Sequence, residues 1–515
     1  MSGILDAKGY GVTGYNFRAG GTTVKILAIL GGFATLHITL VAQTASQRPW
    51  QPAIPRSWDP AELEAWTIPP RTPGVRIVHL PASFVYSIPA YTIYKTYPIY
   101  HPAREPQGYM EWLSHQEPEI TFDATKLHSE SDWIAAGKLV FEAAVDFESV
   151  DKFRSPDWYD KLHVPLTTEG IVPGRRYVIR KKGVVEAAAS ACAGCHSRVM
   201  PDGTLRNGPQ TTFPVERDFA WTIRKEKDMA AARGLMSGLY FPSWKASLLA
   251  DGISEKDIDE IARMHEAIPP GVNTRIGISV LTPPKVADLI GIKDRKYLDL
   301  IARIRHRNIG DLMRYPIWEL GETAFYADRN AIPPEAMPSP SSLYRYSDEQ
   351  AYALALYIYS LQSPPNPNRP DSNTVRGERI FQREGCAACH TPPLYTNNKL
   401  TLAGDFQPPA DHRSKYDILD VHVGTDPRSS MLPMRGTGYY KVPSLKGLWY
   451  RGPLEHNGSV ATLEDWFDAS RLRPDYVPTG FVGYGIKTRA VTGHKFGLAL
   501  SPEEKKALIA FLRTL

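Results

Sequence analysis

The fold of this chain is decided by Cys192-Ala193-Gly194-Cys195-His196 and by its echo, Cys386-Ala387-Ala388-Cys389-His390. All four cysteines of the chain lie in these two pentapeptides. The spacing C-x-x-C-H is typical of c-type haem attachment, in which two thiols bond to the haem and the next imidazole binds its iron. A thioredoxin-like redox pair needs no such histidine, and a zinc site needs more ligands nearby. The sequence therefore predicts two covalently bound haem c groups, held by Cys192, Cys195, Cys386 and Cys389, with His196 and His390 on the two irons.

Length and charge limit the other possibilities. A chain of 515 residues is long enough for two or more domains with sizeable cores. Its formal net charge is +5 at pH 7, and the propionate groups of two haems would cancel most of it. We therefore expect neither nucleic acid nor a charged membrane surface as a partner. With every cysteine used, no structural disulfide is expected.

The first 46 residues predict the compartment. Basic residues precede a mostly apolar run at 26–41, and small residues follow at 42–46. This order is typical of a secretory signal or of a single membrane anchor. The run is short for a membrane span of about 20 residues, so a cleaved signal and an uncleaved anchor both remain open for 1–46. Either one predicts a periplasmic or extracellular protein, possibly anchored to the inner membrane.

Sequence outside the motifs also repeats. Gly137 is followed four positions later by Phe141, and Gly377 by Phe381, a spacing that puts both residues on one helical face. Farther along, 347–361 and 501–515 share the frame S-x-E-x-x-x-A-L with a capping-box start and helical spacing of apolar residues. We therefore predict a mainly α protein with two cytochrome c-like haem domains related by duplication.

The repeat also sets the predicted boundaries. Residues 47–130 are rich in proline and aromatic residues and read as an extended N-terminal arm, with a short strand near 75–80. The first haem domain is predicted at 131–362, with insertions that include the β-like run 176–180. A stiff proline-rich linker follows at 363–370. The second haem domain is predicted at 371–515.

The most specific family signal is the run Lys441–Leu463, KVPSLKGLWYRGPLEHNGSVATL. Together with the repeated plan over 131–515, it resembles the bacterial dihaem cytochrome c peroxidase superfamily, which includes the maturation enzyme of methylamine dehydrogenase and the dihaem rubber oxygenases. The variant Trp449-Tyr450-Arg451-Gly452-Pro453 is similar to the rubber-oxygenase branch.

The resemblance implies a ligand for the second iron. In this family the distal ligand comes from a loop shortly before the closing helix and is often methionine. His494 stands at that place here. Two imidazoles, His390 and His494, would saturate the iron, which favours electron transfer over catalysis at the second haem.

The first iron is predicted to differ. No histidine lies between His196 and His265, so an open or water-bound sixth position is favoured. The alternatives are a methionine such as Met337 and a distant histidine, either His265 or His306. By resemblance, Glu335 would be the acid/base that assists peroxide cleavage and His306 would line the first haem pocket.

These observations favour an exported dihaem oxidoreductase. Peroxide is the expected oxidant, dioxygen the alternative, with an organic substrate or a redox partner protein as electron donor. Arg451 is expected to pair with a haem propionate, and the resemblance allows a calcium ion. The alternative from another functional class is a non-catalytic dihaem electron-transfer protein, with both irons six-coordinate.

Overall fold

The computed structural model describes residues 50–69, 71, 81–227, 257–274, 280–321, 344–431 and 436–515. It also gives the backbone of six short strands outside or at the edges of these ranges. They are β1 (Ile4–Leu5), β2 (Gly11–Ala19), β3 (Thr22–Ile29), β4 (Val41–Ala42), β5 (Arg76–Ile77) and β12 (Tyr326–Ala327). The chain divides into two units, residues 1–53 with 128–130, and residues 54–127 with 131–515.

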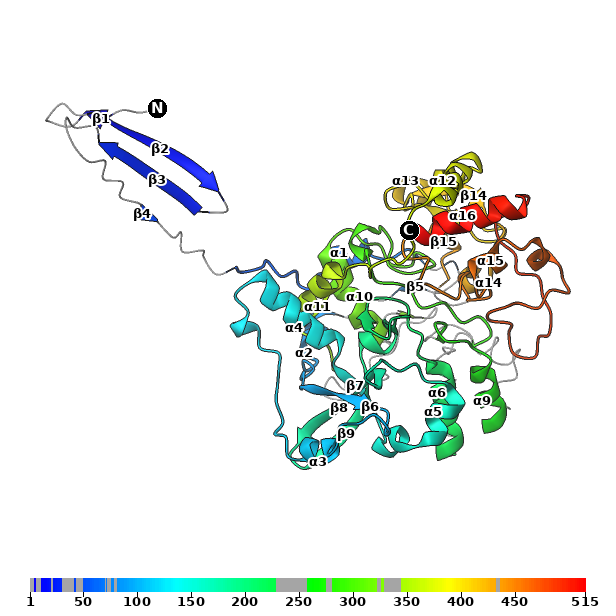
Figure 1. The fold of residues 1–515 in the computed structure, drawn as a ribbon, viewed down its shortest axis with the longest axis horizontal. Helices are drawn as coiled ribbons and strands as arrows, with labels where there is room; N and C mark the ends of the chain where they lie inside the picture. The colour runs from blue at the N-terminus through cyan, green and yellow to red at the C-terminus, as the bar shows by residue number, and fades with distance from the viewer. Residues whose placement is uncertain are drawn as a thin grey trace. The chain divides into compact units, whose positions relative to one another are not determined.

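The smaller unit contains one sheet in the order β1-β2-β3-β4 (Figure 1). Strands β2 and β3 pair antiparallel from Val12 opposite Ile29 to Ala19 opposite Thr22. The apolar run predicted as a signal or anchor begins inside β3, and its residues 30–40 lie outside the described part. In the described residues no helix combines the length and apolar character that a membrane crossing needs.

The larger unit alternates helices and strands. The helices of the first half are α1 (Pro60–Glu64), α2 (Ala82–Ser87), α3 (Tyr109–Ser114), α4 (Glu130–Phe141), α5 (Pro156–Leu162), α6 (Val215–Glu226), α9 (Ile258–Glu266), α10 (Ile309–Gly321) and α11 (Asp348–Ser360). The helices of the second half are α12 (Ser372–Arg383), α13 (His412–Lys415), α14 (Arg428–Met431), α15 (Leu463–Trp466) and α16 (Pro502–Thr514). Described residues 363–370, the predicted linker, contain no helix or strand.

Between α4 and the first haem motif, the chain forms three strands of a four-stranded antiparallel sheet. Its order is β6-β8-β9-β7, formed by β6 (Thr96–Tyr100), β8 (Ile171–Lys181), β9 (Val184–Ser190) and β7 (Ala144–Glu148). The predicted β-like run at 176–180 lies inside β8, so that expectation is confirmed. Strand β6 comes from the predicted N-terminal arm and pairs Tyr97 with Tyr177. The arm therefore contributes an edge strand to this sheet.

Smaller sheets lie after each motif. Strands β10 (Ser197–Val199) and β11 (Leu205–Asn207) form a hairpin directly behind the first motif. Strands β13 (Leu400–Leu402), β14 (Ile418–His422) and β15 (Tyr439–Lys441) form a sheet in the order β14-β13-β15. The prediction of a mainly α protein is thus only partly correct, because the fold is a mixture of α and β. The arm and the segments between each motif and its closing helix lack the alternating apolar pattern that would predict these strands from the sequence.

The two repeated helix pairs cross in the same way. A Cβ built on Gly137 of α4 would lie 1.9 Å from the carbonyl oxygen of Ala353 in α11, and one on Gly377 of α12 would lie 2.0 Å from that of Ala507 in α16. Glycine is therefore required at both crossings, as the sequence pattern suggested. Figure 1 shows α12 in yellow beside α16 in red.

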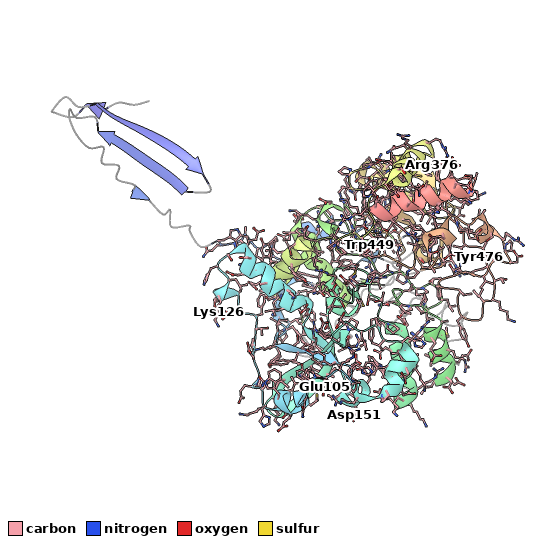
Figure 2. All side chains as sticks on the ribbon, viewed as in Figure 1. Glu105, Lys126, Asp151, Arg376, Trp449 and Tyr476 are labelled. Carbon is pink, nitrogen blue, oxygen red and sulfur yellow. The ribbon has the colours of Figure 1, made fainter. Side chains whose placement is uncertain are left out.

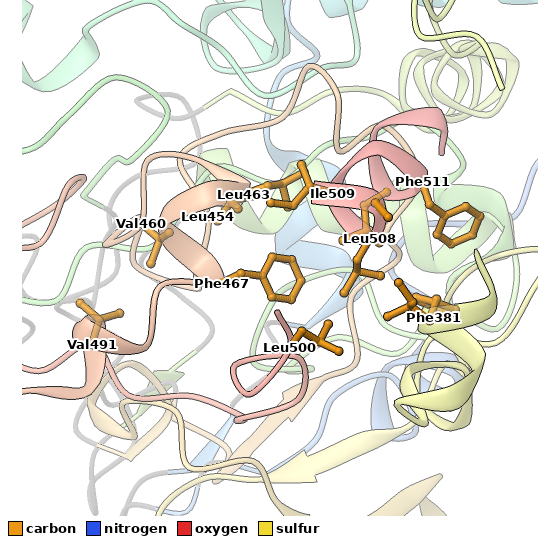
Figure 3. Packing of buried hydrophobic residues seen from close by; sticks show 13 residues of the cluster. Phe381, Leu454, Val460, Leu463, Phe467, Val491, Leu500, Leu508, Ile509 and Phe511 are labelled. Atoms are coloured by element: carbon orange, nitrogen blue, oxygen red, sulfur yellow. The ribbon is translucent and has the colours of Figure 1, made fainter. Parts of the chain in front are cut away.

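Aromatic rings fill the space next to each crossing. Phe141 packs against Tyr357 with ring centroids 5.3 Å apart, and Phe381 packs against Phe511 at 5.4 Å. In the second half this contact belongs to a buried cluster, shown in Figure 3. The cluster contains residues of α12, α15 and α16 and of the connecting segments at 454–460 and 491–500. The capping boxes predicted at Ser347 and Ser501 are both present.

Candidate functional site

The first motif forms a short 3-10 turn, Cys192–Gly194, directly after β9. Strand β8 holds this turn from the side. A Cβ on Gly174, whose φ is +66°, would lie 2.8 Å from the Cα of Gly194 and 2.9 Å from the carbonyl oxygen of Ala193. The sheet therefore packs backbone against backbone on the turn, which fixes the position of the first motif.

The second motif forms the same kind of turn, Cys386–Ala388, but it follows α12 with only a few residues between. Backbone bonds repeat between the motifs, since His196 N donates to Cys192 O and His390 N donates to Cys386 O, both at 2.8 Å. This turn brings each histidine back next to its own cysteine pair.

The thiols have the character of buried attachment groups. Burial first, and then Cys195, raise the pKa of Cys192 to about 12. Burial, followed by Glu384, raises the pKa of Cys386 to about 11. Reactive cysteine pairs of redox proteins have a depressed pKa instead, and all four cysteines are free of disulfide bonds. The raised pKa of these thiols is not the pattern of a dithiol redox centre.

The proximal imidazole of the second motif is oriented by the backbone. His390 Nδ1 donates to the carbonyl oxygen of Pro443 at 3.1 Å, with that of Tyr395 at 3.3 Å. A donor bond at Nδ1 fixes the tautomer that leaves Nε2 able to bind a metal. Pro443 belongs to the family-like run 441–463, so that run supports the proximal ligand.

The predicted distal ligand, His494, lies within electrostatic reach of His390. Burial lowers the pKa of His494 to about 4, and the charge of His390 is the next largest cause. A neutral imidazole is the form that binds iron. The ring of His494 contacts Trp466 and Phe496 at centroid distances of 5.2 and 5.5 Å, and its Nδ1 atom is buried with no hydrogen-bond partner in the described residues. The charge of His390 thus acts on His494, the histidine that the resemblance pairs with it, and the role of His494 as a ligand stays a prediction.

A buried arginine holds the loop that carries His494. Arg471 is 0% exposed and donates to three carbonyl oxygens, those of Trp466 at 2.9 Å, Val491 at 2.8 Å and His494 at 2.9 Å. Its guanidinium also lies 4.4 Å from the centroid of the Trp466 ring. Arg471, which lies in the short 3-10 helix Ala469–Leu472, therefore positions the backbone of His494, a role that no sequence pattern indicated.

Glu455 and His456 form a buried pair shortly before α15. His456 Nδ1 lies 2.7 Å from Glu455 Oε2 and 3.1 Å from Thr425 Oγ1. Burial would raise the pKa of Glu455, but His456 outweighs it and lowers that pKa. Glu455 has a φ of +69°, a strained conformation for a residue with a side chain, and its charge also acts on His494. This geometry gives His456 a structural hydrogen-bonding role.

Two side chains missed by sequence reasoning lie next to the first cysteine pair. Asn273 Nδ2 donates to Cys195 Sγ at 3.2 Å. Tyr346, immediately before α11, is 2% exposed, and burial followed by Cys192 raises its pKa well above the ordinary value. The only sequence signal was the position of Tyr346, one residue before the capping serine of the closing helix.

His265, an alternative ligand for the first iron, is fully buried in α9. Its Nδ1 lies 2.5 Å from Glu216 Oε2 on α6, and its ring contacts Phe219 at 4.6 Å. The other carboxylate oxygen of Glu216 accepts from Thr274 N and Oγ1 at 2.5 and 2.9 Å. Because Thr274 follows Asn273, this chain of contacts connects His265 to Cys195.

Of the residues predicted to serve the first haem pocket, His306 lies in the described part of the chain. His306 Nδ1 donates to the carbonyl oxygen of Arg295 at 2.8 Å, and its Nε2 lies 2.5 Å from Tyr359 Oη. Burial lowers the pKa of His306. Both ring nitrogens thus have protein partners. Glu335 and Met337 lie outside the described residues, so their roles stay predictions.

Arg451 donates to the carbonyl oxygens of Ser444 and Lys446 at 2.8 and 2.6 Å. This places it beside Pro443, and so beside the backbone that orients His390. Across the described ranges no group of three or more histidine, cysteine, aspartate or glutamate side chains is arranged to hold a metal ion, and calcium stays a prediction.

Comparison with known proteins finds distant relatives. The chain is 28% identical over 155 residues to the cytochrome-c peroxidase IdrP2 of Denitromonas iodatirespirans, and 26% identical over 160 residues to IdrP1 of the same organism. Each match covers 27% of this chain, and the chain spans 38% and 39% of those two relatives. No family model matches the chain. These similarities support a haem oxidoreductase in general.

Among solved structures, the hydrazine synthase of Kuenenia stuttgartiensis aligns with 33% of this chain and 56% of its own. The TM-score is 0.21 and the sequence identity 19%, values too low to establish a common fold.

Proposed function

We propose that this protein is an exported dihaem c-type cytochrome and an oxidoreductase, with a catalytic haem at the first motif and an electron-transferring haem at the second. The observation that supports the proposal is that His390 acts electrostatically on the buried His494, as expected if both imidazoles serve the second motif. The distant similarity to two cytochrome-c peroxidases makes peroxide the favoured oxidant and a redox protein the favoured electron donor.

The residues present fit haem at both motifs. Two thiols and a histidine stand together in each turn, and His390 has the Nδ1 bond that metal-binding histidines usually have. When bound, a haem iron with an open sixth position reacts with peroxide, whereas one held by two imidazoles only exchanges electrons.

Each side chain has a separate task in this proposal. Cys192 and Cys195 hold the first haem, with Asn273 bonded to Cys195 Sγ. Arg471 fixes the loop of His494 and so keeps the second site closed to small ligands. Glu335 is proposed to move the proton that peroxide cleavage requires. A dioxygen reaction is the enzyme alternative, because it needs an open iron but little acid/base help.

An optical experiment tests whether only one of the two haem irons has an open sixth position. The haem-loaded protein is purified, its haems are counted by mass and by the pyridine haemochrome spectrum, and the reduced form is titrated with carbon monoxide. We expect two haems per chain and binding of carbon monoxide to one of them. Binding to neither, with both irons low-spin, would leave an electron-transfer protein and end the catalytic proposal.

Replacing the distal histidine tests the assignment of the second site. His494→Ala should open the second iron, so that carbon monoxide binds both haems and a high-spin band appears. The matched control is His422→Ala, since His422 lies exposed in β14 of the same half. An unchanged spectrum in the His494 variant would remove this histidine as a ligand.

A further inference from the structure

The side chain of Asn273 touches a sulfur atom that is predicted to carry the first haem. Its Nδ2 atom donates to Cys195 Sγ at 3.2 Å, and Asn273 is 5% exposed. A cysteine sulfur that is joined to haem is a thioether, which has no hydrogen and can only accept such a bond. In the haem-loaded protein the amide group of Asn273 therefore keeps its nitrogen toward the sulfur.

Asn273 holds this orientation at the expense of its other polar atom. Its Oδ1 atom is buried and has no hydrogen-bond partner among the described residues. A buried acceptor without a partner is unfavourable, and turning the amide over would give up the bond to the sulfur. The bond from Nδ2 to Cys195 is thus the contact around which this side chain is placed.

A closed ring of hydrogen bonds fixes the loop of Asn273 relative to Cys195. Thr211 N donates to Cys195 O at 3.1 Å, and the neighbouring Gln210 Nε2 donates to Gly271 O at 2.8 Å. Gln210 and Thr211 are both buried. The ring closes through Asn273, two residues after Gly271, so the position of its amide does not depend on the sulfur contact alone.

The same loop is paired with a second segment of backbone. Asn273 N donates to Pro284 O at 3.1 Å, and Val286 N donates to Gly271 O at 2.9 Å. These bonds hold the residues on either side of Val272 in an extended conformation. The backbone that carries the amide is therefore supported along its length.

A buried carboxylate anchors the next residue of the loop. Glu216 on α6 is 5% exposed and accepts from Thr274 N and Oγ1 at 2.5 and 2.9 Å. Its other oxygen lies 2.5 Å from Nδ1 of His265 on α9, which is fully buried. Figure 1 shows α6 beside α9, and Figure 2 adds their side chains. Because a buried carboxylate needs partners for its oxygens, His265 stabilises the group that holds Thr274.

We propose that Asn273 sets the reduction potential of the first haem through its hydrogen bond to Cys195 Sγ, and that Glu216 and His265 are positioning residues that act through Asn273. The inference rests on the proposed dihaem function. It extends that function to Asn273 and Glu216, which no sequence pattern indicated, and gives His265 a role other than that of an iron ligand.

The direction of the effect follows from the donor. A hydrogen bond given to a substituent of the haem draws electron density away from the iron and stabilises the reduced form. The second motif differs at this point, since Asn397 Nδ2 donates to the backbone oxygen of Ala388 at 3.1 Å. The amide bond to sulfur should therefore raise the potential of the first haem and leave that of the second unchanged.

Potentiometric titration of the haem-loaded protein, followed optically, tests the proposal, and carbon monoxide binding marks which midpoint belongs to the first haem. Asn273→Leu keeps the size of the side chain and removes the donor. We expect about a threefold change in the one-electron equilibrium of the first haem, a midpoint about 28 mV lower at about 59 mV per tenfold change. Asn273→Asp, which keeps the shape without the amide hydrogens, should lower the same midpoint. Asn368→Leu, a linker asparagine bonded to Asn366 at 2.9 Å, is the control.

A double-variant cycle tests the positioning role of Glu216. Glu216→Leu removes both acceptor oxygens and should lower the first midpoint, whereas Glu216→Gln keeps an acceptor for Thr274 and should retain the wild-type value. Glu216→Leu combined with Asn273→Leu should lower the midpoint no further than Asn273→Leu alone, because residues that act through one contact are not additive. Additive shifts would overturn the positioning role. If Glu216→Leu does not fold, Thr274→Val, which removes one donor to Glu216, replaces it with a smaller expected shift.

Three outcomes of the titration decide the inference. An unchanged first midpoint in both Asn273 variants, with two haems bound, would overturn it and leave the dihaem proposal intact. An equal fall of both midpoints would show a general loosening of the chain and would overturn it as well. A wild-type chain that carries no haem would instead overturn the proposed function, on which the inference rests.

Discussion

The two halves of the larger unit share a frame and differ in what surrounds it. Each frame is a helix pair crossing at a glycine, with Gly137 against Ala353 and Gly377 against Ala507. The first motif is separated from its helix by the sheet β6-β8-β9-β7, and it is packed against Gly174. The second motif follows α12 directly, and its His390 acts electrostatically on His494. The helix pair thus supplies the position of a haem, and the segments around the motif decide its chemistry.

The largest expected effect comes from breaking one frame at a time. Gly137→Ala or Gly377→Ala places a Cβ about 2 Å from a backbone carbonyl oxygen, which neither helix can avoid without moving apart. We expect each variant to lose about 5 kcal/mol or more of unfolding free energy, measured by denaturant unfolding. The controls are Lys138→Ala and Arg379→Ala, exposed positions in the same helices. Equal stability of variant and control would show that the crossing tolerates separation.

The next largest effect is expected from the buried ion pairs of Asp218, which connect α6 to the sheet of the first half. Asp218 on α6 accepts from Arg175 at 2.7 Å and pairs with Lys152 at 2.6 Å, all buried. Asp218→Asn leaves two buried cations with one carboxylate fewer, which should cost about 3–5 kcal/mol. Asp157→Asn removes an exposed ion pair and should cost at most about 1 kcal/mol. Calorimetric unfolding of both variants measures the difference.

The same carboxylate gives the first half a pH dependence. Burial would raise the pKa of Asp218, but Lys152 and Arg175 outweigh it and lower that pKa below 3.8. A carboxylate with a lowered pKa stabilises the fold above 3.8, and this contribution is lost as pH falls through the folded-state pKa. The stability gap between wild type and Asp218→Asn should therefore narrow below pH 3.8. A constant gap would argue against the ion pairs as its source.

A smaller effect tests how firmly the second site is closed. Arg471→Met leaves three buried carbonyl groups without their donor, at a cost of about 3 kcal/mol. We expect the His494 loop to loosen, so that a fraction of the second haem binds carbon monoxide. Arg473→Met, an exposed arginine paired with Asp475, is the control. Full exclusion of carbon monoxide in the Arg471 variant would assign the closure to other contacts.

The smallest effect is expected from a substitution that gives the first helix pair the aromatic residue of the second. Tyr357 occupies the place of Phe511, and its hydroxyl bonds to Asn207 Nδ2 at 2.9 Å. Tyr357→Phe should cost about 1 kcal/mol and leave the haem spectra unchanged, as denaturant unfolding and optical spectra can check. A spectral change would mean that this hydroxyl also influences the first haem.

Local sequence signals predicted the frame well. Capping serines, helical spacing and a glycine four residues before an aromatic residue are short-range patterns, and they correctly placed α11, α12 and α16. His494 was proposed from its distance to the closing helix, and its role as a ligand stays a prediction. Covalent chemistry at the C-x-x-C-H motifs needs no tertiary information to be recognised.

The features of the fold and site that the sequence did not predict depend on contacts between distant segments. The pairing of β6 with β8 joins residues about 80 positions apart, and no local pattern in the aromatic arm specifies that partner. The predicted roles of Glu335 and Met337 stay open because both lie outside the described residues.

The contact between Gly174 and the turn of the first motif has a consequence for how the protein matures. In the folded chain β8 packs on the backbone of Ala193 and Gly194, the two residues between Cys192 and Cys195, which restricts the approach of a bulky planar group on that side. The turn at Cys386, with Ala388 exposed, has no such cover. We expect the N-terminal half to be loaded before its sheet docks, and the C-terminal half to accept its haem at any stage; mass spectrometry of singly loaded chains would reveal that order.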